Sequence, residues 1–151
     1  MYKIFTVCTA NVCRSPTAEM LLKKELNKYK NLSIKSFGTD ALFGKQIYEP
    51  MKPFLFQKGI EHFNEHRSKQ LFLNDIKDAD MILCMENYHV DWICQKTPLA
   101  KNKVKLFGHW EERTEVYDPV DNQNGVQFVF ETLERMAMQW KPKIDLLGLH
   151  S

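Results

Sequence analysis

The stretch from Cys8 to Ser15 most constrains how this chain folds, because the residues on its two sides have different periodicities. Residues 2–7 form an apolar run typical of a buried strand, whereas an amphipathic run with helical spacing begins at Ser15-Pro16. The chain is therefore expected to pass from a strand through a tight loop into a helix. Asn11 suits such a loop, because asparagine tolerates backbone angles that most residues avoid.

Cys8 and Arg14 bracket this loop and indicate a phosphate site. The peptide N–H groups between them can converge on one point at the helix N-terminus, where an anion is favoured. The same positive end favours a Cys8 thiolate, and Arg14 supplies a planar fork for two phosphoryl oxygens. A nucleophilic sulfur beneath a phosphate cradle predicts a cysteinyl-phosphate intermediate. An inert buried cysteine with an arginine nearby by chance is the alternative interpretation of this spacing.

Residues 7–16 resemble the phosphate loop of the low-molecular-weight protein tyrosine phosphatases. The family usually carries glycine where this chain has Ala10, so the backbone angle of Ala10 bears on whether the loop can form. Residues 103–110 and 133–140 resemble more narrowly the bacterial members that accompany capsule and exopolysaccharide export. The resemblance continues, in the family's order, through Ser36–Thr39, His66–Ser68, Asp80–Met85 and Asp118-Pro119.

The resemblance also implies roles for the residues of the loop. Ser15 would hydrogen-bond the Cys8 sulfur or cap the helix, and the Asn11 side-chain amide would fix the loop. Independently of the resemblance, Cys13 lies five residues after Cys8 in a loop that curls upon itself, which makes it either a partner that traps an oxidised Cys8 or buried filler. The phosphoryl group would be bound by Thr9, Ala10, Asn11, Val12, Cys13 and Ser15. No metal or cofactor is expected.

Four apolar stretches alternate with helical patterns and predict an α/β fold. We expect a three-layer, open, parallel four-stranded sheet flanked by helices, with the phosphate loop after the first strand. The strands are expected at 2–7, 32–36, 80–85 and 104–107. Helices are expected from Pro16, from about Met51 to Gly59, from His66, from Tyr88 to Cys94 and from Val126 to Trp140, with Pro142 disfavouring continuation of the last.

The composition fits one globular domain spanning residues 1–151. Hydrophobic residues make up 44% and charged residues 26%, and the net charge is +2, so neither disorder nor nucleic-acid binding is expected. No apolar run has transmembrane length, and the chain enters a strand at once, which predicts a cytoplasmic protein without membrane insertion. The four cysteines do not have the spacing of a zinc site.

Asp118 is the expected general acid. It lies in the loop 108–124 after the fourth strand, and Pro119 restricts its backbone to extended angles. A phenolate leaves more easily if a carboxylic acid protonates it, and the resulting carboxylate can then activate water. Glu115 and Asp121 in the same loop are the alternatives. The family usually carries an aromatic residue where this chain has Val120, so the expected cleft walls are Leu42, Tyr48 and Tyr117.

The resemblance implies a protein-tyrosine-phosphatase whose partner is a phosphotyrosine protein, specifically an autophosphorylated bacterial tyrosine kinase of polysaccharide export. An arsenate reductase of the same fold is one alternative, with Cys84 and Cys94 as its further cysteines. A non-catalytic phosphotyrosine-binding module is another, if Ala10 distorts the loop. His66 is expected to be a hydrogen-bonding structural group rather than a catalytic base.

Overall fold

A four-stranded parallel sheet forms the centre of the computed structural model, which describes residues 1–120 and 124–150. The order of the strands is β2-β1-β3-β4, and every pairing is parallel. The apolar runs are buried on both faces, as parallel strands require. The predicted sheet is thereby confirmed. Its strands are β1 (Tyr2–Cys8), β2 (Leu32–Gly38), β3 (Met81–Cys84) and β4 (Val104–Leu106).

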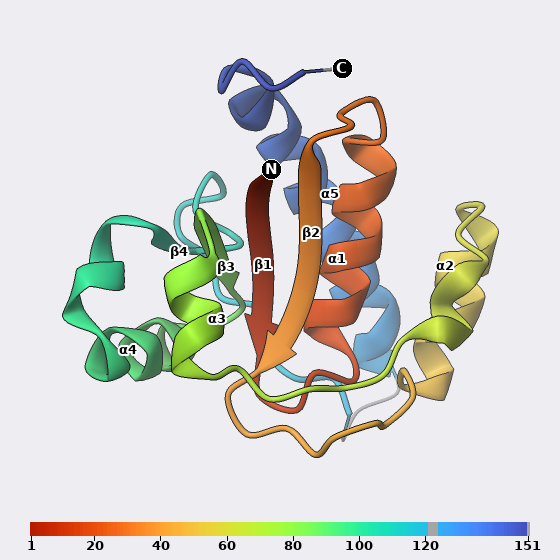
Figure 1. Cartoon of the computed structure of the whole chain (residues 1–151). Helices are drawn as coiled ribbons and strands as arrows, with labels where there is room; N and C mark the ends of the chain where they lie inside the picture. Colours follow the sequence, from red (N-terminus) through yellow and green to blue (C-terminus); the bar gives the residue numbers. More distant parts are fainter. Residues whose placement is uncertain (121–123, 151) are drawn as a thin grey trace.

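Helices cover both faces of the sheet, which confirms the three-layer prediction (Figure 1). On one face, α1 (Arg14–Glu25) and α5 (Asn124–Asp145) pack against Ile4 and Leu83. On the other, α3 (Leu73–Asp78) and α4 (Asn87–Lys96) pack against Phe5, Val7 and Ile82. The remaining helices are η1 (Glu49–Met51), α2 (Lys52–Gln57), η2 (His62–Glu65) and η3 (Pro98–Asn102).

The expected helix from His66 is not formed. The short helix η2 ends at Glu65, and residues 66–71 run extended beside the end of β2. Gly38 donates its N–H to the Lys69 carbonyl and accepts from the Leu71 N–H, at 3.0 and 2.8 Å. These long-range bonds occupy backbone groups that a helix would need.

Pro142 does not end the last helix, because α5 continues to Asp145. A proline inside a helix removes one backbone hydrogen bond and crowds the preceding turn. Ile144, two residues further on, is fully buried, and Trp140 is 2% exposed. Burial of the two side chains on either side of Pro142 stabilises the last turn against that loss.

The register of the strands places the phosphate loop at the carboxyl edge of the sheet. Cys8 ends β1 directly opposite Gly38, and Val7 pairs with Cys84 of β3. Ligands bind at this edge in open parallel sheets. Among the described residues, no helix combines the length and apolar character needed to span a bilayer.

Candidate active site

The phosphate loop, residues 8–15, is held by its carbonyl groups. The carbonyls of Cys8, Thr9 and Val12 accept N–H bonds of 2.8–3.0 Å from the segment 39–48. The Asn11 carbonyl accepts from His66 Nε2 at 2.7 Å. Within residues 1–120 and 124–150, by contrast, no group accepts from the N–H groups of residues 10–13. Those unpartnered donors at the start of α1 are suited to an anion.

The strained position in the loop is Asn11 rather than Ala10. Asn11 has φ of 59°, in the left-handed region, and Ala10 is not among the described non-glycine residues with positive φ. Asn11 is fully buried; its side chain donates to Ser15 Oγ at 2.8 Å and accepts from the Lys69 N–H at 3.0 Å. Asn11 therefore fixes the loop as expected, and the Cβ of Ala10 carries no penalty for a left-handed backbone.

The expected contact between Ser15 and Cys8 is present, with Oγ 2.9 Å from Sγ. Because the Ser15 hydroxyl accepts from Asn11, its own proton is left for the Cys8 sulfur or for the Phe37 carbonyl, 3.3 Å away. A thiolate can only accept, so this hydroxyl is able to stabilise the charged form of Cys8. Cys8 itself is 2% exposed.

Arg14 is buried beside the loop and is partly occupied by the protein. Its Nη1 donates to Glu86 Oε2 at 2.5 Å and to the Val116 carbonyl at 2.9 Å. A guanidinium has five N–H groups, so Nε and Nη2 keep three. In the described part of the chain these atoms have no hydrogen-bond partner, and together they form a two-pronged donor suited to two oxygens of an anion.

The motif did not predict Glu86 or His89, yet both brace the site. His89 Nδ1 accepts from the Glu86 N–H at 3.0 Å, so its Nε2 carries the proton and donates to Thr9 Oγ1 at 2.8 Å. Burial, reinforced by the charge of Arg14, lowers the pKa of His89 to about 4. The imidazole is therefore neutral at physiological pH. One signal was available: Glu86 follows the apolar stretch 80–85, at the sheet edge where a partner for Arg14 was needed.

His66 is a structural group, as expected. Its bond to the Asn11 carbonyl supports the left-handed turn, and its burial lowers its pKa. Burial raises the pKa of Cys13 to about 12, with smaller contributions from Cys8 and Asp118. Cys13 is therefore a neutral thiol near pH 7, which favours its interpretation as buried filler, since thiols attack oxidised sulfur slowly.

The acid loop, residues 108–120, is tied to the phosphate loop on both sides of Asp118. Before Asp118, the Val116 carbonyl accepts from Arg14. After it, the Val120 carbonyl accepts from the Tyr48 hydroxyl at 3.1 Å, while the Tyr48 N–H binds the Val12 carbonyl at 2.8 Å. Asp118 Oδ1 accepts from the Val120 N–H at 3.0 Å. These bonds fasten both ends of the segment 116–120, which contains Asp118, to the phosphate loop directly or through Tyr48.

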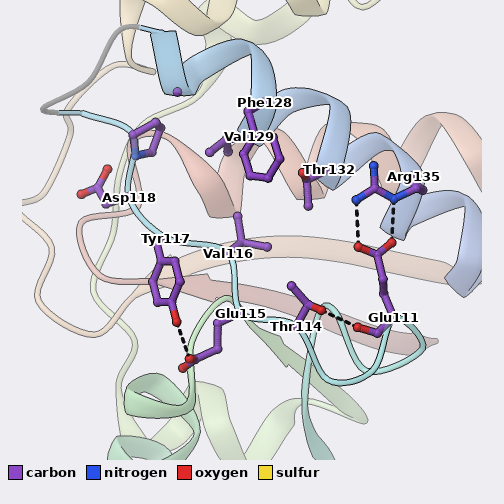
Figure 2. A pocket seen from close by; sticks show the side chains of 12 residues that line it. Glu111, Thr114, Glu115, Val116, Tyr117, Asp118, Phe128, Val129, Thr132 and Arg135 are labelled. Atoms are coloured by element: carbon purple, nitrogen blue, oxygen red, sulfur yellow. Dashed lines mark hydrogen bonds and ion pairs between the residues drawn. The ribbon is translucent and has the colours of Figure 1, made fainter.

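The other two expected cleft-wall residues have different surroundings. The Tyr117 hydroxyl donates to Glu115 Oε2 at 2.9 Å (Figure 2). Glu115 Oε1 accepts from the Asn87 N–H at the start of α4, at 2.7 Å. Glu115 is thus an anchor of the acid loop. Leu42 is 69% exposed on the segment that crosses the sheet edge. Asp121, an alternative acid, lies outside the described residues. In the part of the chain that is described, no group of three or more His, Cys, Asp or Glu side chains is arranged to hold a metal ion.

Known proteins are similar to this chain in sequence and in fold. The pattern of the low molecular weight phosphotyrosine protein phosphatase family matches residues 3–146. The low molecular weight protein-tyrosine-phosphatase Wzb of Salmonella typhi is 37% identical over 144 residues, which are 95% of this chain and 94% of Wzb. The probable phosphatase AmsI of Erwinia amylovora is 36% identical and covers 91% and 93% of the two chains.

Solved structures agree in fold but differ in the substrate they are named for. The tyrosine phosphatase Wzb from Escherichia coli K30 in complex with phosphate superimposes with a TM-score of 0.82 at 32% identity, over 95% of this chain and 99% of Wzb. The arginine phosphatase YwlE from Geobacillus stearothermophilus superimposes with a TM-score of 0.88 at 30% identity, over 100% and 99%. From its sequence, its fold and the geometry of its loop, the chain belongs to the low molecular weight phosphotyrosine protein phosphatase family.

Proposed function

We propose that the protein hydrolyses phosphotyrosine in proteins, with Cys8 as nucleophile, Arg14 as phosphoryl clamp and Asp118 as general acid. The observation that carries this proposal is the polarity of the phosphate loop. Its carbonyls are bound from outside, while within the described residues the N–H groups of residues 10–13 and two nitrogens of Arg14, in the loop that follows Cys8, remain unpartnered.

In the proposed first step, Cys8 Sγ attacks phosphorus in line and the bond from phosphorus to the tyrosyl oxygen breaks. Arg14 and the loop N–H groups stabilise the equatorial oxygens, and Asp118 gives its proton to the departing phenolate. In the second step, the Asp118 carboxylate takes a proton from water, which attacks the cysteinyl phosphate and releases inorganic phosphate. Ser15 stabilises the thiolate that leaves.

The rim of the loop supports an aromatic ester over phosphoarginine. Two apolar side chains, Ala10 and Val12, lie half-exposed in the loop, and Tyr48 bridges it to the acid loop. A guanidinium group carries several N–H donors that need acceptors, whereas a phenyl ring needs apolar contact. The methyl groups of Ala10 and Val12 offer no acceptors, which leaves a guanidinium to rely on carboxylates outside the loop such as that of Asp118.

The test compares the hydrolysis of phosphotyrosine and phosphoarginine in otherwise identical peptides. We expect kcat/KM to favour phosphotyrosine by at least about tenfold, which corresponds to roughly 1.4 kcal/mol in the transition state. Cys8→Ser should abolish turnover of both, because a serine hydroxyl is a much weaker nucleophile than a thiolate and, once phosphorylated, a poor leaving group. A preference for phosphoarginine would contradict the assigned substrate but leave the phosphatase chemistry intact.

Two rival functions are less well supported. An arsenate reductase would have to pass oxidation from Cys8 to Cys84, but Cys84 packs on the opposite face of the sheet from Cys8 and is fully buried. A non-catalytic module was suggested by Ala10, whose backbone is not left-handed. A thioredoxin-coupled arsenate assay that gave turnover would reverse the first judgement.

We further propose a cellular role from the resemblance of residues 103–110 and 133–140 to bacterial phosphatases of polysaccharide export. The protein would act in the cytoplasm on an autophosphorylated tyrosine kinase. Incubation of such a kinase with wild-type protein should remove its phosphotyrosine, whereas Cys8→Ser should leave it in place. A kinase that kept its phosphotyrosine in both incubations would contradict this role.

A further inference from the structure

A cavity of about 360 Å³ lies between the acid loop and α5 (Figure 2). We propose that this cavity, here called the side pocket, binds a neutral apolar or aromatic side chain of the phosphoprotein, close to its phosphotyrosine. The proposal rests on the proposed function. It adds a second contact that selects among phosphotyrosine sequences.

The walls of the side pocket are apolar. Val116 and Val129 are buried and form part of its lining together with Pro119. At its mouth, the rings of Tyr117 and Phe128 are 64% and 68% exposed. These two exposed rings would lose contact with water if an apolar side chain packed between them, and that burial is favourable. A volume of this size is at the lower end for ligand pockets.

The polar groups of the side pocket are mostly satisfied by one another. Glu111 binds Arg135 through two bonds of 2.6 and 2.8 Å, and Glu115 accepts from Tyr117 and Asn87. Two groups are exceptions: one oxygen of the exposed Asp118 carboxylate, and Thr132, which is 4% exposed and whose hydroxyl has no partner among the described residues. An occupant therefore meets apolar walls, the free Thr132 hydroxyl and charged groups that, apart from one oxygen of Asp118, are already bonded within the protein.

The charges around the side pocket select against acidic occupants. Glu111, Glu115 and Asp118 line it together with the guanidinium of Arg135, so the lining is negative overall even when Asp118 carries the proton that it donates in the proposed mechanism. A substrate carboxylate placed there would pay the cost of desolvation and would be repelled by the net negative charge of the lining. A neutral side chain avoids both costs.

The occupant is a substrate side chain because the side pocket adjoins the proposed site of chemistry. Asp118 lines the pocket and, in the proposed mechanism, protonates the phenolate of the bound phosphotyrosine. An extended peptide covers about 3.3–3.6 Å per residue, so four residues reach roughly 14 Å from the phosphotyrosine. A residue within that distance can place its side chain between Tyr117 and Phe128.

The experiment uses phosphotyrosine peptides that differ at one position, which carries Phe, Ala or Asp, scanned over four residues on each side. With the wild-type protein, we expect kcat/KM to favour Phe over Asp by roughly tenfold or more at one position at least. If all peptides are hydrolysed at one rate, the side pocket proposal is wrong while the proposed function stands. If all are inert, both fail.

Variants then locate the preference in the side pocket. Phe128→Ala should reduce the Phe-to-Asp ratio to within about threefold, and F128R should reduce it further, because a cation at the mouth attracts the aspartate. The ratio is formed within each variant, so a general change in activity cancels. Phe56→Ala, which truncates an equally exposed ring on α2, should keep the wild-type ratio. If Phe128→Ala kept the wild-type ratio of kcat/KM between the Phe and Asp peptides, the proposal would be overturned. It would also be overturned if a small molecule bound at Phe128 and the rate of peptide hydrolysis did not change.

Discussion

The guanidinium of Arg14 divides its N–H groups between two sets of partners. Nη1 holds Glu86 and the Val116 carbonyl, and thereby fixes both the arginine and the approach to Asp118. Nε and Nη2 have no hydrogen-bond partner among the described residues, and in the proposed mechanism they bind phosphoryl oxygens. Lysine at this position has one nitrogen and cannot do both, which explains in physical terms why an arginine stands here.

Replacing Asp118 by a residue that cannot donate a proton should slow the hydrolysis of phosphotyrosine more than that of an activated ester. Asp118→Asn keeps the size of the side chain but cannot protonate a leaving group, so phosphotyrosine cleavage should fall by on the order of 10²–10⁴-fold. A nitrophenyl ester, whose phenolate leaves unaided, should lose much less. The first phosphoryl transfer must be measured by rapid quench, because Asp118 is also proposed to activate water in the second step.

Equal losses for both esters in that first transfer would remove Asp118 from the role of acid. Glu115 would then be an unconvincing replacement, because both of its carboxylate oxygens are engaged, by Asn87 and Tyr117. Cys8→Ser serves as the reference variant, in which both esters should lose all turnover.

Loss of the Tyr48 hydroxyl should weaken the acid loop without removing any catalytic group. A neutral hydrogen bond contributes about 0.5–1.5 kcal/mol, so Tyr48→Phe should lower kcat for phosphotyrosine by roughly two- to tenfold. The activated ester should be affected less, because only acid catalysis depends on the placement of Asp118. Tyr29→Phe, which removes a hydroxyl bonded to Asp145 far from the loop, is the matched control. An equal loss for the two esters would mean that Tyr48 acts on binding instead.

Among the secondary-structure elements, the contact between β2 and the phosphate loop depends on the absence of a side chain at Gly38. A Cβ built there lies 2.3 Å from the Thr9 carbonyl oxygen and 3.1 Å from the Asn11 nitrogen. Gly38→Ala should therefore displace the loop and reduce phosphatase activity by at least about tenfold, a cost of roughly 1.4 kcal/mol in the transition state. The fold should persist, since the clash is local.

Gly59→Ala provides the control for Gly38→Ala. Gly59 has φ of +80°, and no atom lies within 4 Å of the place that a Cβ would occupy. Alanine should therefore cost about 1–2 kcal/mol of stability, because of its left-handed backbone alone, while activity is retained. Activity is measured by ester hydrolysis and stability by urea unfolding. If Gly38→Ala lowers mainly activity and Gly59→Ala lowers mainly stability, displacement of the loop is distinguished from backbone strain. Wild-type activity in Gly38→Ala would show that the loop yields easily.

The sequence predicted what local periodicity determines. Apolar runs located all four strands, and the pattern from Val126 to Trp140 located α5. The prediction was wrong where contacts between residues distant in sequence determine the structure. Residues 66–71 pair with Gly38 instead of forming a helix, and burial of Ile144 stabilises the part of α5 that follows Pro142. In the site, the motif predicted the residues of the phosphate loop itself. It could not predict the brace formed by Glu86 and His89, because these residues reach the loop only when the fold places β3 beside β1.

Considered as a whole, the molecule builds its candidate site where the two helical layers meet the sheet edge. From one layer, α1 contributes Arg14 and Ser15; from the other, α4 contributes His89, which donates to Thr9. The acid loop joins them through Val116 and Glu115. His89 is thus a buried link between layers, and its protonation state affects the stability of the entire fold.

Stability should fall as the pH drops below about 6.5, and His89 should account for a measurable part of the fall. Burial and Arg14 lower its pKa to about 4 in the folded protein, against 6.5 for an ordinary histidine. Between these values the unfolded chain binds more protons, so the free energy of unfolding decreases as pH decreases. From pH 7.5 to 5 the contribution of His89 amounts to about 2 kcal/mol.

The measurement is urea unfolding of wild type and His89→Gln at pH 7.5 and pH 5. Glutamine cannot be protonated, so the wild-type protein should lose about 2 kcal/mol more than the variant over this interval. His66 and His109 also have lowered pKa values and contribute to the fall in both proteins, which is why the difference between the two falls is the relevant quantity. If the two proteins lost the same free energy, His89 would have to be protonated in the folded state near neutral pH, and its Nδ1 would no longer be able to accept the Glu86 N–H that begins α4.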